Sequence, residues 1–195
     1  MSETAPIKPI AIDPGPRADL TPKLQAYFDK CQEKLGFVPN VLQAYAFDTR
    51  KLQAFIDMVD DLMLADSGLS KLEREMIAVA VSAVNHCHYC LTAHGAAVRM
   101  RSGSAKFGDT IAHNWRAADL DDRQTAMLDF AVKLTEAPDK ITEDDRAGLR
   151  DAGFNDRDIW DIASVAAFYN MSNRLAAATE MQPNAEYYEM ARDTA

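Results

Sequence analysis

The segment from Ser70 to Val84 constrains the fold of this chain more than any other. Ser70 and Glu73 form the S-x-x-E pattern of a capping box, which marks the start of a helix. Almost every position from 76 to 84 is then apolar, so the helix that follows has no polar face. A helix that is apolar all round is buried on all sides. The sequence therefore predicts a central helix around which the rest of the domain packs.

The composition favours the same architecture. The chain has 195 residues, of which 48% are hydrophobic but only 8% aromatic, so its core is built mainly from Ala, Leu, Val, Ile and Met. These residues favour packed helices over a β-sandwich. No stretch alternates between apolar and polar residues as a half-buried strand does. We predict an all-α fold with a central buried helix pair.

Capping residues and helix breakers divide the chain into predicted helices. Two of these helices begin after Thr142 and Asn155, and the earlier ones cover residues 22–35, 41–47, 49–65, 71–84, 87–101, 105–114 and 122–135. Four prolines among the first residues predict an extended arm rather than a helix. We expect an N-terminal arm over residues 1–19, a helical domain over residues 20–182 and a C-terminal tail over residues 183–195.

A faint internal repeat connects two parts of the chain. Residues 68–85 align with residues 153–170 at a fixed offset, with matching glycine, polar cap, Ile, Ala and Asn positions. The same register places Ser172 against Cys87, so the second copy would keep a helix pair and lack its reactive side chains. The sequence therefore suggests a helix-pair repeat.

Charge and cysteine usage exclude several classes of protein. The net charge is −9 and the pI about 4.9, which makes nucleic acid and anionic membranes poor partners. No stretch is long and apolar enough to span a bilayer, and the start of the chain has no secretory signal pattern. Three cysteines in such a chain indicate a reducing compartment, so we expect a cytoplasmic protein. Paired cysteines in that setting are usually catalytic or metal-binding.

The paired cysteines lie in the run Cys87-His-Tyr-Cys90, with His94 four residues further on. On one helix these three side chains fall within an arc of roughly 60°, so they share a face. Glu75 lies twelve residues before Cys87, on the predicted central helix. A dithiol with a base and a carboxylate nearby is suited to thiol–disulfide or peroxide chemistry.

The spacing also indicates a role for each residue. His94 is one turn beyond Cys90, within reach of its thiol, so we interpret Cys90 as the attacking thiol and His94 as its base. Cys87 is then the resolving thiol, because the Cα separation of residues i and i+3 permits a disulfide. Glu75, on an apolar helix, could exchange protons with His94 or with a water.

Other interpretations use the same residues. Zinc could be bound by Cys87, Cys90 and His94 together with His86 or His88, although structural zinc usually gathers its ligands from two separate segments. Cys31 stands alone on an amphipathic helix, where a packing role is expected. A last set of side chains has helical spacing and is expected in the core or at a subunit contact: Trp160, Phe168, Tyr169 and Met171.

The chain resembles the AhpD-like alkylhydroperoxidases of the carboxymuconolactone decarboxylase superfamily, and within it the "uncharacterized peroxidase-related" branch. The resemblance rests on Glu75 and Cys87-x-x-Cys90-x-x-x-His94 at the family's spacing. It extends to residues 36–41, 68–75 and 169–175 and spans roughly residues 20 to 180. One position departs from it, because better-studied members carry a histidine where this chain has Tyr89.

The resemblance implies an AhpD-like helical fold and a peroxidase that needs no cofactor and no metal. It implies that Cys90 is peroxidatic, that Cys87 resolves it, and that His94 and Glu75 relay protons. A hydroperoxide would be the substrate, a dithiol of the thioredoxin or lipoyl type the electron donor, and the protein a homo-oligomer (dimer, trimer or hexamer). The alternatives are a disulfide reductase without significant peroxidase activity and a non-catalytic, zinc-binding or oxidant-sensing helical oligomer.

Overall fold

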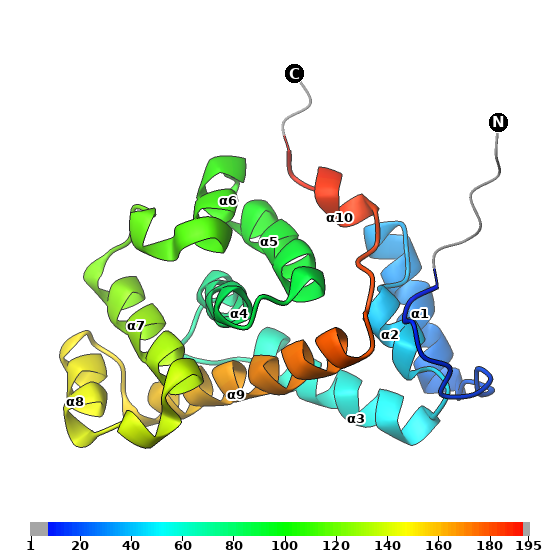
Figure 1. Ribbon diagram of the computed structural model, residues 1–195, viewed down its shortest axis with the longest axis horizontal. Helices are drawn as coiled ribbons and strands as arrows, with labels where there is room; N and C mark the ends of the chain where they lie inside the picture. The colour runs from blue at the N-terminus through cyan, green and yellow to red at the C-terminus, as the bar shows by residue number, and fades with distance from the viewer. Residues whose placement is uncertain (1–7, 193–195) are drawn as a thin grey trace.

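The computed structural model describes residues 8–192, and all regular structure in that range is helical (Figure 1). The all-α prediction is confirmed, and, apart from the end of α3, the predicted helix boundaries agree with the observed ones within a few residues. The α-helices are α1 (Pro22–Leu35), α2 (Asn40–Tyr45), α3 (Thr49–Val59), α4 (Lys71–Val84), α5 (His88–Ser102), α6 (Ala105–Asn114), α7 (Asp122–Glu136), α8 (Glu143–Asp151), α9 (Asp156–Ala178) and α10 (Glu186–Glu189).

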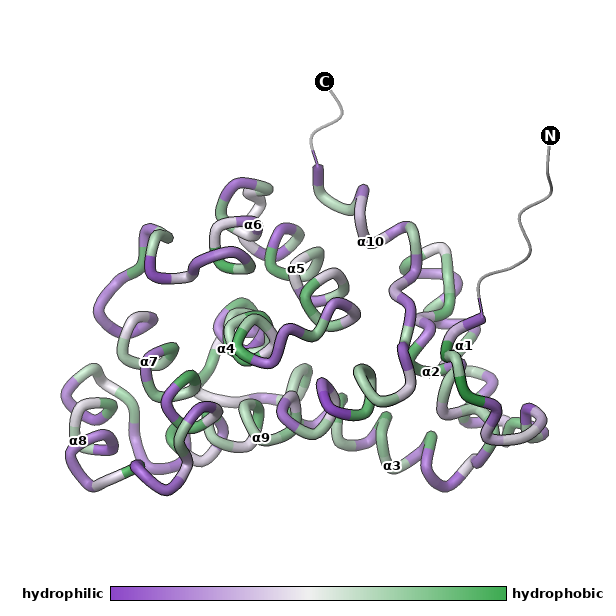
Figure 2. The backbone as a smooth tube through the Cα atoms, in the orientation of Figure 1, coloured by the Kyte–Doolittle hydropathy of each residue, from purple (hydrophilic) through white to green (hydrophobic). Residues whose placement is uncertain are grey.

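Helix α4 is the centre of the fold. Figure 1 shows it nearly end-on, and α5, α6, α7 and α9 all pack against it. Its side chains from Met76 to Val81 are fully buried, and Figure 2 shows this helix as a mainly hydrophobic tube inside the more polar outer helices. Burying an aliphatic side chain of this size contributes about 1.5–3 kcal/mol to stability. The capping box of Ser70 and Glu73 is present at its start, as predicted.

The end of α3 differs from the sequence-based prediction. Instead of one α-helix over residues 49–65, α3 ends at Val59 and a π-helical turn, Asp60–Leu64, follows. The buried guanidinium of Arg74 donates hydrogen bonds to the carbonyl oxygens of Leu62 and Ala65. The widened turn is therefore stabilised by a side chain from α4, which no local pattern in residues 49–65 encodes.

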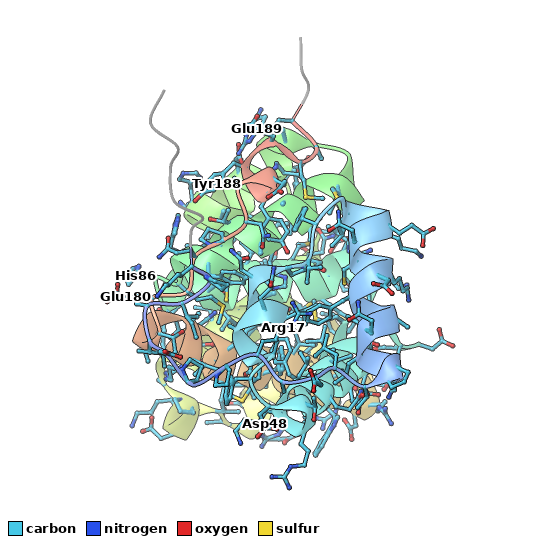
Figure 3. All side chains as sticks on the ribbon, turned by 90° about the vertical axis from the view of Figure 1, so that its right-hand side faces the viewer. Arg17, Asp48, His86, Glu180, Tyr188 and Glu189 are labelled. Atoms are coloured by element: carbon cyan, nitrogen blue, oxygen red, sulfur yellow. The ribbon has the colours of Figure 1, made fainter. Side chains whose placement is uncertain are left out.

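A tight turn separates α4 from α5 and positions the cysteine pair. His86 has φ 53°, in the left-handed region, and lies at the surface (Figure 3). The N–H groups of His86 and Cys87 donate to the carbonyl oxygens of Ala83 and Ser82, as in a Schellman motif. Cys87 then adopts an extended conformation as the N-cap of α5. The turn thus fixes where α5 starts, and with it the direction of both thiols.

The internal repeat is not confirmed as a pair of helix pairs. The caps of α4 and α9 do match, because Ser70 with Glu73 and Asn155 with Asp158 each form a capping box. However, α9 continues unbroken through the positions that correspond to the turn between α4 and α5.

Both ends of the described chain are attached to the helical body. The N–H of Ala11 donates to the carbonyl of Thr179, and the N–H of Gln182 donates to the carbonyl of Pro9. Residues 1–7 of the predicted arm and 193–195 of the predicted tail lie outside the described residues, and the division into arm, domain and tail stays a prediction. None of the described helices has the length and apolar character that a bilayer crossing requires.

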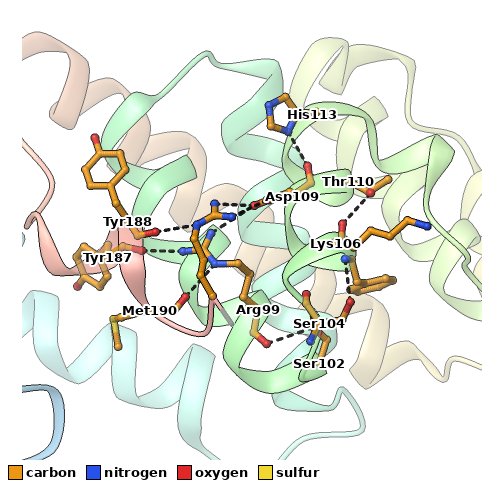
Figure 4. A network of polar contacts seen from close by, with 12 residues as sticks. Arg99, Ser102, Ser104, Lys106, Asp109, Thr110, His113, Tyr187, Tyr188 and Met190 are labelled. Carbon is orange, nitrogen blue, oxygen red and sulfur yellow. Dashed lines mark hydrogen bonds and ion pairs between the residues drawn. The ribbon is translucent and has the colours of Figure 1, made fainter. Parts of the chain in front are cut away.

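A buried arginine attaches the segment that carries α10 to α5. Arg99, 5% exposed, donates hydrogen bonds from its guanidinium to the carbonyl oxygens of Tyr187 and Met190 (Figure 4). Asp109 of α6 lies within ion-pair distance of both Arg99 and Arg192. This network holds the end of the chain over one side of the site described next.

Candidate active site

The central pair of the site is a carboxylate and an imidazole from two packed helices. Glu75, on the second turn of α4, places Oε2 2.7 Å from Nδ1 of His94 on α5. The Glu75 side chain is only 8% exposed. Because a carboxylate can only accept a hydrogen bond, Nδ1 carries the proton and Nε2 is the nitrogen that can exchange protons with another group. The arrangement orients a base as a catalytic proton relay requires.

Two further side chains hold this pair in place. The guanidinium of Arg101 lies 3.6 Å from the other oxygen of Glu75. Tyr169, which reaches the site from α9, packs edge-on against the His94 ring with the ring centroids 4.6 Å apart. Its hydroxyl is 3.4 Å from Nδ1 of His94. The imidazole is therefore fixed on two sides.

The cysteine pair lies at the start of α5, with Cys87 as N-cap and Cys90 in the first turn. Both thiols are free and buried. The pKa of Cys87 is lowered to about 7, chiefly because the thiol of Cys90 donates a hydrogen bond to its sulfur. The pKa of Cys90 is raised, because its proton is held by Cys87 and because the thiol is buried. The two thiols therefore titrate as a coupled pair that loses its first proton near neutral pH and then shares the remaining one, with the negative charge favoured on Cys87.

A buried amide network supports the pair from behind. Nδ2 of Asn173 donates to Oγ of Ser82 at 2.9 Å, and Nδ2 of Asn85 donates to Oδ1 of Asn173 at 2.9 Å. The Asn173 amide also favours the thiolate form of both cysteines. Asn173 is 1% exposed, so its orientation is set entirely by these contacts.

A cavity of about 260 Å³ opens beside these groups. Glu75, Cys90 and His94 form part of its wall, whereas Cys87 is not among the residues that line it. The remaining wall is mostly apolar and comes from α1, α2, α3, α9, the segment after α9 and further residues of α5. A molecule in this cavity would therefore meet the sulfur of Cys90 before that of Cys87.

Comparison with known proteins places the chain in a family. A model of the Carboxymuconolactone decarboxylase family matches residues 50–133, a range that contains all four predicted site residues. An uncharacterized peroxidase-related protein from Silicibacter sp. TM1040 is 59% identical with a TM-score of 0.92, and the match covers 98% of this chain and 100% of that one. An alkylhydroperoxidase AhpD core protein from Ralstonia eutropha JMP134, also described as peroxidase-related, is 43% identical with a TM-score of 0.87, covering 92% and 96%. The chain belongs to the AhpD-like carboxymuconolactone decarboxylase superfamily.

The AhpD-like fold is shared by more distant proteins. The debrominase Bmp8 superposes with a TM-score of 0.73 at 19% identity, over 87% of this chain and 90% of that one. At this level of identity the likeness concerns the fold alone. No curated protein sequence matches at a significant level.

Tyr89, where better-studied AhpD-like proteins carry a histidine, is hydrogen-bonded to the backbone of α2. Its hydroxyl accepts a hydrogen bond from the N–H of Val41 at 3.1 Å. The side chain is buried, and burial raises the pKa of its phenol well above the usual range. The position therefore supports the start of α2.

The other histidines and Cys31 also differ from a catalytic or zinc-binding arrangement. His86 and His88 are exposed, and His88 accepts or donates a hydrogen bond with the hydroxyl of Tyr188 at 2.9 Å. Across residues 8–192, no three His, Cys, Asp or Glu side chains are placed so that they could hold a metal ion, as the zinc interpretation requires. Cys31, expected to be a packing residue, is half-buried and lines the cavity.

Proposed function

We propose that this protein is a thiol-dependent alkylhydroperoxidase, with Cys90 as the peroxidatic thiol and Cys87 as the resolving thiol. The proposal rests on one observation: Cys90 and the hydrogen-bonded pair of His94 and Glu75 line the same apolar cavity. An apolar cavity suits an organic hydroperoxide better than hydrogen peroxide. Membership of the AhpD-like superfamily supports the same class of reaction.

The first step uses the proton that the two sulfurs share. When that proton moves from Cys90 to Cys87, the single negative charge of the pair lies on the sulfur that faces the cavity. This thiolate attacks the terminal oxygen of the hydroperoxide, the O–O bond breaks, and Cys90 becomes a sulfenic acid. The other oxygen leaves as an alkoxide and becomes an alcohol by taking the proton now held by Cys87, which Nε2 of His94 accepts and passes on. The hydroperoxide is reduced and Cys90 is oxidised by two electrons.

The second step explains why a lowered pKa on the resolving thiol is useful. Once its proton has passed through His94 to the alkoxide, Cys87 is a thiolate again, which its pKa of about 7 permits at neutral pH. It attacks the sulfur of the Cys90 sulfenic acid, a disulfide forms, and hydroxide leaves and takes a proton from solvent to give water. A dithiol donor, which we propose to be of the thioredoxin or lipoyl type, then reduces the disulfide and is itself oxidised.

Steady-state turnover tests the proposal. Cumene hydroperoxide would be supplied with reduced dihydrolipoamide as the dithiol, and consumption of the hydroperoxide measured for the wild type and for Cys90→Ser, Cys87→Ser and Cys31→Ser. We expect turnover in the wild type and in Cys31→Ser, which removes the other thiol that lines the cavity, and none in the other two variants. Activity retained in Cys90→Ser would disprove the assignment. Reduction of a small disulfide with no consumption of hydroperoxide would favour the disulfide reductase instead.

A further inference from the structure

One buried hydroxyl in the cavity wall has no hydrogen-bond partner. Within residues 8–192, Oγ of Ser172 is the one buried side-chain nitrogen or oxygen for which the structure shows none. An unpaired buried hydroxyl costs about 1–3 kcal/mol, so such groups are rare in folded proteins and call for an explanation. Ser172 follows Tyr169 by one turn of α9 and lines the same cavity as Cys90 and His94.

The missing partner is not a general property of hydroxyl groups in these helices. Oγ of Ser82 and the Oγ1 atoms of Thr135 and Thr179 each donate to the carbonyl four residues earlier, at 2.6, 2.8 and 2.9 Å. Ser172 lies in the interior of a helix, as Ser82 and Thr135 do, and does not make this bond. Its hydroxyl is therefore available to a molecule in the cavity.

The cavity has room for an organic molecule with one polar end. Its volume of about 260 Å³ exceeds the roughly 150 Å³ that accommodates benzene in an apolar protein cavity. Apolar side chains such as Phe168, Leu175 and Met181 would contact the body of such a molecule, and Cys90, His94 and Ser172 its oxygen. A hydroxyl in this wall would discriminate between ligands that carry an oxygen there and ligands that do not.

We propose that Ser172 is a substrate-binding residue whose hydroxyl donates a hydrogen bond to the oxygen attached to carbon in an apolar hydroperoxide, and in the alcohol that its reduction leaves. The inference deepens the proposed function and rests on it for the identity of the substrate. The oxygen concerned is the one on which negative charge develops as the O–O bond breaks. A donor at this position strengthens its hydrogen bond as the reaction proceeds.

The test compares two ligands that differ only in that oxygen. Binding of cumyl alcohol and of cumene to the reduced protein would be measured by calorimetry for the wild type, Ser172→Ala and Ser164→Ala. Ser164, on the same helix but outside the cavity lining, is the matched control. We expect Ser172→Ala to weaken binding of the alcohol about tenfold, as the loss of one hydrogen bond does. Cumene binding should be unchanged in both variants.

The melting temperature and the turnover assay complete the test. Ser172→Ala should melt at or above the wild-type temperature, because it removes an unpaired polar group. Four results would each overturn the inference. They are unchanged binding of the alcohol in Ser172→Ala, equally weakened binding of both ligands, no binding of the alcohol to the wild type, and a clear loss of stability in Ser172→Ala. If Ser172→Ala selectively weakens binding of the alcohol but the protein reduces no hydroperoxide, the ligand site is upheld and the proposed function is rejected. Turnover of the hydroperoxide, together with alcohol binding that Ser172→Ala does not change, would uphold the proposed function and reject the ligand site at Ser172.

Discussion

The most informative perturbation of the site is the removal of the Cys90 sulfur. The Cys90 thiol is the largest single cause that lowers the pKa of Cys87 from 9.0 to about 7. A shift of this size corresponds to roughly 2–3 kcal/mol of preferential stabilisation of the thiolate. In Cys90→Ala that interaction is lost while the burial of Cys87 remains, so the pKa of Cys87 should rise. At neutral pH the thiolate fraction would then fall well below the value of about one half that a pKa of about 7 gives.

Ultraviolet absorbance of the thiolate measures this directly. The titration would be done in a Cys31→Ser background, so that only the pair contributes, with Cys87→Ala as the control that removes the signal near neutral pH. We expect one thiolate per chain in the parent, with the signal rising from about one tenth to nine tenths between about pH 6 and pH 8. A midpoint near 9 in the parent, or an unchanged midpoint in Cys90→Ala, would refute the shared proton.

Three other substitutions probe the relay, the turn and the C-terminal segment. Glu75→Gln should slow hydroperoxide turnover about a hundredfold, because the His94 ring loses its carboxylate partner, and should leave the melting temperature nearly unchanged. A clear fall in the melting temperature along with the loss of turnover would indicate a structural role. His86→Gly should raise the melting temperature by about 2–4 °C, because glycine adopts a left-handed φ without the cost of about 1 kcal/mol; a lower melting temperature would contradict this. Arg99→Met should lower the free energy of unfolding by about 3 kcal/mol and expose the segment around Met190 to proteases. Resistance to proteolysis equal to that of the wild type would show that other contacts hold the segment.

The parts of this structure that the sequence predicts are those encoded by local patterns. Helix starts follow from caps such as Ser70 with Glu73, and a single helical face brings Cys90 and His94 together. The apolar character of α4 predicts its burial, and the structure shows that Glu75 on this helix is buried as well, with its side chain 8% exposed. Helix packing then places Glu75 against His94, as the proton-relay hypothesis requires.

The rest depends on contacts between segments far apart in the chain. Tyr169 and Ser172 reach the site from α9, and the spacing of Tyr169 predicts only a core or subunit position. Cys31 reaches the cavity from α1, although its own helix indicates a packing residue. Trp160 is 71% exposed and is therefore not part of the core of this chain. The predicted subunit contact at Trp160, the homo-oligomer and the cytoplasmic location stay predictions.

A single-turnover thiol count tests the central claim most directly. Reduced protein would be exposed to one equivalent of cumene hydroperoxide, and free thiols would be counted before and after, together with mass analysis after a sulfenic acid trap. We expect the wild type to lose two of its three thiols to a disulfide between Cys87 and Cys90. Cys87→Ser should accumulate a trapped sulfenic acid on Cys90, and Cys90→Ser should lose none. No rapid loss of thiols in the wild type, or a sulfenic acid on Cys87 in Cys90→Ser, would contradict the central claim.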